Sequence, residues 1–476
     1  MKKRTALITL GVVLVVIAAL GILAYAKREF IEQVPLGCAF KAKSLCAGVF
    51  VQGLPPQTIE REDSGFSPTF SILKAKINYE KKSVTCSLLG TGLFAKTAVY
   101  IEGLGPVLLS GVSEKKLRAM APQAAPSTAA DQAGIDWPAG DREPKGRAAI
   151  PAIDTAALAA AVDATFVERD SAHLKRTRAI IVLLDGRIVA ERYAEGIRPD
   201  TRLLSWSMAK SFTNTMVGIL ARQGAIDIHE PAPVPEWKGA NDPRHAISTD
   251  ILLRMSSGLS FYEEYADHPI SDVNRMLFLE PDTAAFAAAK RLVAKPDTVW
   301  SYSSGTANIV SRIVRDSIGN EADYLTFPRR ELFDKIGMRS AVFSADASGI
   351  FVGSSFLYAT ARDYARYGLL CLNDGVWLGT RILPEGWMAY STTATPGAPK
   401  GQYGAFFWLN KGSPGKPADR EYPDMPTDLY WADGYQGQMI YVCPSLKLVA
   451  VRLGMSWNSD WGSAAFLNGV RKAIKK

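Results

Sequence analysis

A helix that carries a hydroxyl and an amine on one face is the feature that most restricts how this chain folds. The segment starting at Ser207 has apolar residues at 212, 216, 217, 219 and 220 and stops at Gly224, as a buried helix with a terminal glycine does. Ser207 and Lys210 are three residues apart and share a face. Because desolvation lowers the pKa of a lysine, the pair predicts a nucleophile beside its base. An N-cap serine with a solvated lysine is the alternative.

The Ser-x-x-Lys spacing alone is not informative, because it occurs four times in the chain. The other matches start at Ser71, Ser113 and Ser413. Ser413 is followed by a proline, and the other two fall in short segments without a comparable helix. Only Ser207 therefore remains a candidate nucleophile.

A second candidate motif is Tyr302-Ser303-Ser304, the only Tyr-x-Ser or Tyr-x-Asn triplet in the sequence. A phenol has an ordinary pKa of about 10 and can relay a proton to a leaving group while it is neutral. Ser304 would add a hydroxyl to the network of Lys210 and Tyr302. The alternatives are a buried tyrosine with a satisfied hydroxyl and a turn serine.

Together with the downstream run Asp433-Gly434-Tyr435-Gln436-Gly437-Gln438, these motifs occur in the order found in penicillin-recognising serine hydrolases. The chain resembles that group, which contains class C β-lactamases, DD-peptidases and esterases, over about residues 150 to 470. A Leu-Leu-x-x-x-Ser-Gly-Leu run at 252–259 adds to the resemblance. The Ser-Trp-Ser-Met-Ala-Lys-Ser and Tyr-Ser-Ser runs are similar to the branch that includes 6-aminohexanoate-dimer hydrolases.

The resemblance implies an oxyanion hole formed by two backbone N–H groups, those of Ser207 and Gln438. Such donors are commonly the largest single catalytic contribution, and they survive side-chain changes. The triplet Tyr435-Gln436-Gly437 stands where relatives carry Lys-Thr-Gly or His-x-Gly, and neither of those occurs in this chain.

The lysine or histidine of those triplets would bind the carboxylate of a β-lactam or of a peptide, so its absence changes which substrates are expected. We therefore expect weak β-lactamase activity, with Trp206 and the triplet 435–437 binding substrate. A plain edge strand and a core tryptophan are the alternatives.

The length of 476 residues allows two folded units, and the composition suggests four segments. Residues 1–26 are an apolar anchor, 27–115 a small β-rich module, 116–150 an Ala/Pro-rich linker and 151–476 the hydrolase domain. Short strands are expected at 47–51, 83–88 and 97–101 in the module. The domain is predicted to be α+β. An Ala-rich helix from Asp154, a hairpin turning at Asp185-Gly186, strands at 403–409 and 430–453 and a closing helix at 459–476 give an antiparallel sheet flanked by helices, plus a helical lobe.

The N-terminal stretch from Thr5 to Ala26 is uncharged and long enough to cross a bilayer. With the basic residues 2–4 before it, it predicts an inner-membrane anchor whose body is exported to the periplasm or cell exterior. A cleaved signal peptide is the alternative. Export would permit one disulfide, for which Cys46 with Cys86 is the preferred pair.

Several other functions are disfavoured. A net charge of +8 without a basic stripe argues against nucleic-acid binding, and the four histidines form no metal-binding pair. No cofactor motif is recognised, and the Gly-x-Ser-x-Gly elbow of α/β-hydrolases is missing. The sequence therefore predicts a serine hydrolase acting on a small ester or linear amide. A DD-peptidase or β-lactamase, and a non-catalytic sensor of peptide or cell-wall ligands, remain as alternatives.

Overall fold

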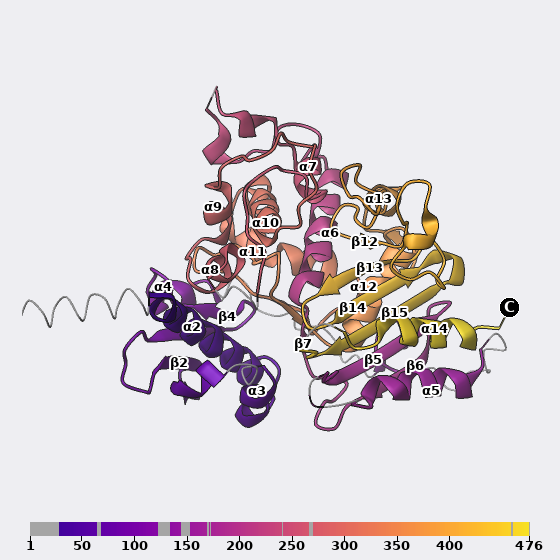
Figure 1. Ribbon diagram of the computed structural model, residues 1–476, viewed down its shortest axis with the longest axis horizontal. Helices are drawn as coiled ribbons and strands as arrows, with labels where there is room; N and C mark the ends of the chain where they lie inside the picture. Colours follow the sequence, from indigo (N-terminus) through magenta and orange to yellow (C-terminus); the bar gives the residue numbers. More distant parts are fainter. Residues whose placement is uncertain are drawn as a thin grey trace, which may run out of the picture.

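The computed structural model describes residues 28–63, 68–121, 134–143, 153–168, 171, 173–239, 241–265, 270–457 and 460–475. The predicted anchor at 1–26 lies outside these residues. Among the helices of the described ranges, none combines the length and the hydropathy that a bilayer span requires. Figure 1 shows three parts: an N-terminal module, a helical lobe and a large sheet with helices on its faces.

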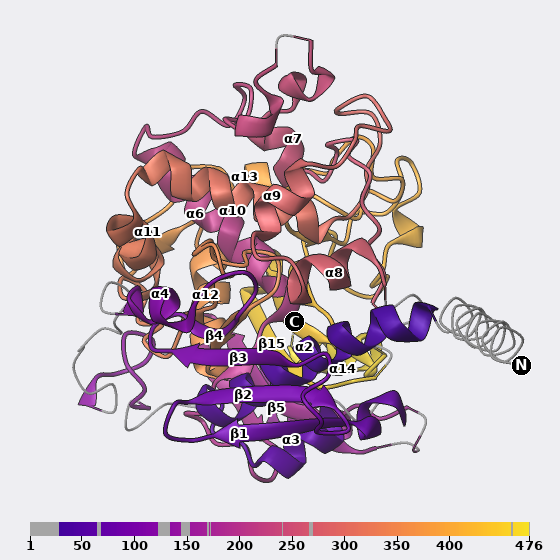
Figure 2. The same ribbon diagram turned by 90° about the vertical axis from the view of Figure 1, so that its left-hand side faces the viewer.

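The N-terminal module is a four-stranded antiparallel sheet in the order β1-β2-β3-β4, and a long helix, α2, packs against it. Figure 2 shows these strands in front of the helix. The predicted strands at 83–88 and 97–101 correspond to β2 and β3. The elements are α2 (Arg28–Phe50), α3 (Pro56–Glu62), β1 (Leu73–Asn78), β2 (Ser83–Leu88), β3 (Lys96–Ile101), β4 (Gly105–Leu108) and α4 (Glu114–Arg118).

The strand predicted at 47–51 is wrong, because residues 47–50 form the last turn of α2. Ala47 and its neighbours are buried in the module, and this packing outweighs the local preference for a strand. A Cβ added to Gly48 would lie 2.0 Å from Cδ1 of Ile59. The glycine therefore lets α3 pack closely across the end of α2.

The module packs against the remainder of the chain through polar and aromatic contacts. Arg178 donates hydrogen bonds to Glu62 and Asp63 at 2.9 and 3.1 Å, and its side chain is almost fully buried. The rings of Phe40 and Phe278 meet edge to face, with centroids 5.2 Å apart. Because truncating one partner of a buried ion pair is costly, these contacts hold the module in place.

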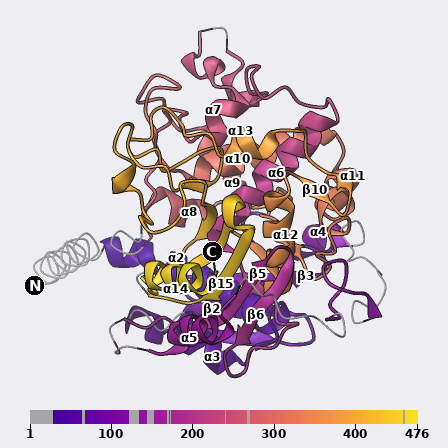
Figure 3. The same ribbon diagram turned by 90° about the vertical axis from the view of Figure 1, so that its right-hand side faces the viewer.

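The large sheet has six antiparallel strands in the order β12-β13-β14-β15-β5-β6. Helices α5 and α14 cover one face and α12 covers the other, so β5 is buried along its whole length (Figures 1 and 3). The predicted hairpin turns at Asp185 and Gly186, both with positive φ. The elements are α5 (Thr155–Phe166), β5 (Thr177–Leu184), β6 (Arg187–Tyr193), α12 (Ala361–Leu372), β12 (Trp408–Leu409), β13 (Tyr430–Gly434), β14 (Gln438–Cys443), β15 (Leu448–Gly454) and α14 (Ser463–Ala473).

The helical lobe lies above the sheet in Figure 1, and the helix that begins beside Ser207 runs between the two. A small sheet in the order β7-β9-β8 joins it to the rest. This arrangement confirms the α+β fold predicted for residues 151–476. The elements are β7 (Leu203–Leu204), α6 (Ala209–Arg222), α7 (Thr249–Leu253), α8 (Asp272–Phe278), α9 (Thr283–Ala288), α10 (Ser304–Ile318), α11 (Glu321–Pro328), β8 (Val342–Phe343), β9 (Leu357–Ala359), β10 (Val376–Trp377), β11 (Thr380–Arg381) and α13 (Trp387–Ser391).

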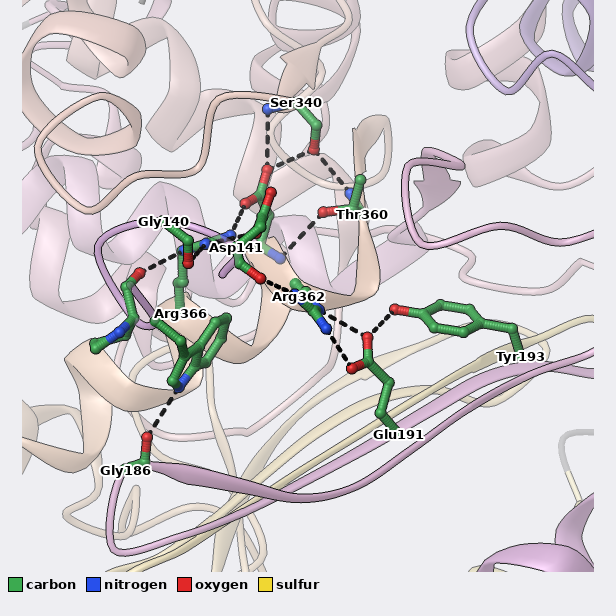
Figure 4. A network of polar contacts seen from close by, with 12 residues as sticks. Gly140, Asp141, Gly186, Glu191, Tyr193, Ser340, Thr360, Arg362 and Arg366 are labelled. Carbon is green, nitrogen blue, oxygen red and sulfur yellow. Dashed lines mark hydrogen bonds and ion pairs between the residues drawn. The ribbon is translucent and has the colours of Figure 1, made fainter. Parts of the chain in front are cut away.

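The described part of the predicted linker, residues 134–143, is fixed to the domain by two arginines of α12 (Figure 4). Arg366 donates to the carbonyl of Gly140 at 2.6 Å and to Asp141 at 2.7 Å. Arg362 binds the carbonyl of Asp141 and forms a bidentate pair with Glu191 of β6. This segment is therefore an ordered strap across the domain.

The predicted disulfide between Cys46 and Cys86 does not form. All five cysteines are buried free thiols, and it is Cys38, not Cys46, that influences the pKa of the Cys86 thiol most strongly. Burial raises the pKa of Cys46 to about 12, so this thiol is an unreactive part of the core.

Candidate active site

Ser207 lies in a single 3₁₀ turn, η4 (Trp206–Met208), that leads into α6. The residue before it, Trp206, has a φ of 44°, a left-handed conformation that is costly for a bulky side chain. The indole holds this conformation by donating to Oε1 of Gln436 at 3.2 Å and by packing on Tyr435, with centroids 5.6 Å apart. The turn leaves Ser207 partly exposed just before the N-terminus of the buried helix α6.

Lys210 lies in the first turn of α6 with its ammonium group inside the protein. Its Nζ donates to Oγ of Ser207 at 3.0 Å, to Oγ of Ser304 at 3.0 Å and to the carbonyl of Ser354 at 3.1 Å. Burial lowers the pKa of Lys210 to about 8, although nearby carboxylates oppose the shift. A useful fraction of the amine is therefore neutral near pH 8 and can accept the serine proton.

Tyr302 completes the group around the serine hydroxyl. Its ring lies beneath the lysine, with Nζ of Lys210 4.7 Å from the ring centroid, and its hydroxyl is near enough to Ser207 for that serine to oppose the rise in its pKa. Burial raises the pKa of Tyr302 well above 10. The phenol is therefore neutral at physiological pH and can pass a proton along.

Glu263 is a member of this network that sequence reasoning missed. Ser304, the first residue of α10, donates its hydroxyl to Oε1 of Glu263 at 2.5 Å and its amide to Oε2 at 2.7 Å. Burial raises the pKa of Glu263, while Lys210 lowers it. The carboxylate follows the 252–259 run by four residues, and only that closeness to a recognised motif could have drawn attention to it.

Asp433, near the end of β13, is a second carboxylate in the site. Burial raises its pKa to about 7, and attraction to Lys210 partly opposes this shift. The two carboxylates together keep the pKa of Lys210 from falling further. The site therefore contains two acidic groups around one amine.

The predicted oxyanion donor Gln438 is wrong, because its amide lies inside a hairpin. The triplet 435–437 forms the turn between β13 and β14, and Gln438 pairs with Gly434 across that hairpin. The carbonyl of Gly434 accepts from the amide of Gly437 at 3.0 Å, so the backbone groups of Gly434 point towards β14. The amide of Gln438 faces Gly434 and is used within the sheet.

The amide of Tyr435 lies on the other edge of β13. The carbonyl of Leu429 accepts a hydrogen bond from the amide of Asn410, which lies on the β12 side of β13. Backbone N–H and C=O groups of alternate residues point to the same edge of a strand. The backbone groups of residues 431, 433 and 435 therefore also point to the β12 side. Strand β12 pairs only with Tyr430 and Trp431, which leaves the end of this edge open within the described residues. A Cβ added to Gly434 would lie 2.2 Å from the carbonyl oxygen of Ser205, so the strand end touches the turn that carries Ser207.

The predicted substrate-binding residues separate into two groups. Tyr435 stacks on Tyr265 at 5.0 Å and packs on Trp206, and Gln436 binds the same indole, so three of the four lie beside the serine. Gly437 instead packs against Trp461, which belongs to the core on the other face of the sheet.

A serine hydroxyl that contacts a buried lysine and a neutral phenol, at the junction of a helix and the end of an antiparallel strand, defines a serine-dependent hydrolase. A model of the Beta-lactamase family matches residues 162–465, and the chain belongs to this family of hydrolases.

Known proteins of similar sequence and fold agree with this assignment. A 6-aminohexanoate-dimer hydrolase of Paenarthrobacter ureafaciens is 26% identical over 309 residues, which are 59% of this chain and 73% of that protein. A Bacillus anthracis protein provisionally named a 6-aminohexanoate-dimer hydrolase is 24% identical, with a TM-score of 0.52 over 63% of this chain and 79% of its own. A family VIII carboxylesterase is 16% identical, with a TM-score of 0.52 over 70% of this chain and 100% of its own. These two solved structures support the fold.

Proposed function

We propose that this protein is a serine hydrolase that forms an acyl-enzyme at Ser207 and acts on an ester or a small linear amide. The observation that carries the proposal is the 3.0 Å contact between Nζ of Lys210 and Oγ of Ser207, with the ring of Tyr302 beneath the same Nζ. A buried lysine with a lowered pKa beside a partly exposed serine is an arrangement that activates a serine hydroxyl.

In the proposed reaction the neutral amine of Lys210 removes the hydroxyl proton as Oγ attacks the substrate carbonyl. The resulting oxyanion is bound by the amides of Ser207 and Tyr435. The leaving oxygen or nitrogen departs with a proton relayed by Tyr302, which recovers one from Lys210. Water then attacks the acyl-enzyme by the same route in reverse, releasing the acid and restoring the serine.

The charges of the site favour a neutral substrate over one that carries a carboxylate, as a β-lactam does. Asp433 stands near Lys210, and the sequence provides neither Lys-Thr-Gly nor His-x-Gly to bind a substrate carboxylate. A 26% identical relative is a 6-aminohexanoate-dimer hydrolase, which supports testing linear amides, and because the dimer itself ends in a carboxylate it should be tested both free and with that carboxylate capped. We propose that β-lactamase activity is weak.

Labelling with a fluorophosphonate probe tests the nucleophile. Wild-type protein should be labelled and Ser207→Ala should not; the absence of labelling in both would favour a non-catalytic sensor. Steady-state rates on p-nitrophenyl acetate, 6-aminohexanoate dimer, a chromogenic cephalosporin and a D-Ala-D-Ala peptide then separate the substrate classes. A cephalosporin or peptide rate equal to the ester rate would contradict the substrate assignment.

We also propose that residues 5–26 anchor the protein in the inner membrane, with the catalytic domain on the outer side. The uncharged stretch and the preceding basic residues support this topology. Protease treatment of spheroplasts should digest the domain, whereas protection of the domain would contradict it.

A further inference from the structure

A cavity of about 320 Å³ lies between the N-terminal module and the hydrolase domain, directly behind the catalytic turn. Such a volume is in the range of small-molecule sites, roughly 300 to 1,000 Å³. The cavity is partly open to solvent and its lining is mostly apolar, so an apolar ligand can enter it and bury surface there.

Two different parts of the chain form the walls. On the module side, α2 contributes Leu36 and Phe40, and Phe70 lies beside them; on the domain side, Phe278 and Phe356 close the space. The family match begins at residue 162, so the module wall lies outside it. In Figure 1, α2 lies directly beneath α8, which carries Phe278.

The cavity adjoins the active site through three aromatic side chains. Trp206, Tyr265 and Tyr435 line it. Trp206 precedes the nucleophile, and the hydroxyl of Tyr265 lies 3.5 Å from Oγ of Ser304. Tyr435 supplies the proposed second oxyanion amide. Ser207, Lys210 and Tyr302 do not line the cavity, so an acyl chain on Ser207 would enter it past these three rings.

One cation also lines the cavity, and the protein itself accommodates its charge. Nζ of Lys43 donates to the carbonyl of Pro106 at 2.7 Å and lies 4.2 Å from the ring centroid of Phe356. Burial lowers the pKa of Lys43 to about 8. The remaining lining is dominated by aromatic and aliphatic side chains, which suits a hydrocarbon chain.

We propose that this cavity binds the long apolar acyl chain of the substrate, so that the module selects medium- to long-chain acyl esters or amides. This inference rests on the proposed function, because it names the acyl group that Ser207 receives. Each methylene buried in such a site adds to transition-state binding if the chain is held during the reaction.

Hydrolysis by the full-length protein tests the acyl preference. Wild type should show a kcat/KM for p-nitrophenyl decanoate at least about tenfold above that for the acetate, since several methylenes are buried. Ser44, on α2, lines the cavity and is only partly buried, so Ser44→Phe places a ring in this space. The variant should lose most of the decanoate preference. Ile31→Phe, at an exposed position on the same helix, is the matched control and should retain it.

A binding measurement separates this inference from the proposed function. Ser207→Ala should bind a fluorescent dodecanoic acid analogue, decanoate should displace it, and adding Ser44→Phe should weaken binding at least about tenfold. Equal decanoate and acetate rates, or binding unchanged by Ser44→Phe, would overturn the acyl-chain site even if Ser207 is labelled. If Ser44→Phe blocks binding but fluorophosphonate does not label the wild-type protein, the apolar site would be supported and the proposed hydrolase activity rejected.

Discussion

Glu263→Gln is the most direct test of how the site sets the basicity of Lys210. Both groups contact Oγ of Ser304, at 2.5 and 3.0 Å, so the carboxylate and the ammonium are at most about 5.5 Å apart. With an effective dielectric constant of about 20, their attraction is about 3 kcal/mol. This corresponds to about two pKa units, and Glu263 is the strongest charge that opposes the desolvation of Lys210.

The sign of the effect follows from the active protonation state. Lys210 must be neutral to accept the serine proton, so wild-type kcat/KM should rise with pH through about 8, the pKa of this lysine. Removing the carboxylate destabilises the ammonium and lowers that pKa by one to two units on the order-of-magnitude estimate above. The acidic limb of the profile should therefore move to lower pH, and activity at pH 6 should rise relative to the plateau.

The assay is the pH dependence of kcat/KM for p-nitrophenyl acetate between pH 5.5 and 9.5. Glu264→Gln is the matched control, because its carboxylate accepts from the amide of Tyr265 and is not among the charges that act on Lys210. A limb that stays in place or moves to higher pH in Glu263→Gln would refute the electrostatic argument. Thermal unfolding checks that both variants remain folded.

Three further substitutions test separate parts of the structure. Tyr302→Phe should lower kcat/KM by about 10² to 10⁴, because the proton relay is lost, as measured with an ester whose leaving group is poor. Gly434→Ala should lower ester kcat/KM by about 100-fold, because its Cβ would displace the carbonyl of Ser205; Gly239→Ala, with no neighbour closer than 3.7 Å, should not. Arg366→Met should lower the free energy of unfolding by about 3–5 kcal/mol in urea titrations, because two carboxylates lose their buried partner. Unchanged rates or unchanged stability would contradict the corresponding argument.

The features that sequence predicted well are those fixed by local chemistry. The helix after Ser207 follows from its apolar spacing, and the hairpin at Asp185-Gly186 from the need for two positive φ values. The four predicted catalytic residues lie close together in the structure: Ser207, Lys210, Tyr302 and Ser304. This could be predicted because the chain shares the order of its motifs with known hydrolases, and proteins that share this order share a fold.

The features that sequence missed depend on long-range packing or on register. Residues 47–50 remain helical because α3 packs on Gly48, which no local pattern reveals. We propose Tyr435 rather than Gln438 as the second oxyanion donor because the hairpin turns at 435–437, so that Gln438 pairs with Gly434 while the amide of Tyr435 points to the opposite edge. Glu263 lies in a loop whose path only the folded structure fixes.

The charge balance of the site leads to a last prediction about substrate selection. Burial raises the pKa of Asp433 to about 7 and lowers that of Lys210 to about 8, so both groups become more negative as pH rises from 6 to 9. A neutral ester gains from the neutral lysine, whereas a substrate with a carboxylate is increasingly repelled by the ionised Asp433. The ratio of kcat/KM for methyl-capped over free-acid forms of one ester should therefore increase over this range. Asp433→Asn should flatten the increase, because no charge then develops at this position. A ratio that is independent of pH in the wild type would show that Asp433 does not face the bound substrate, and the reason given for weak β-lactamase activity would fail with it.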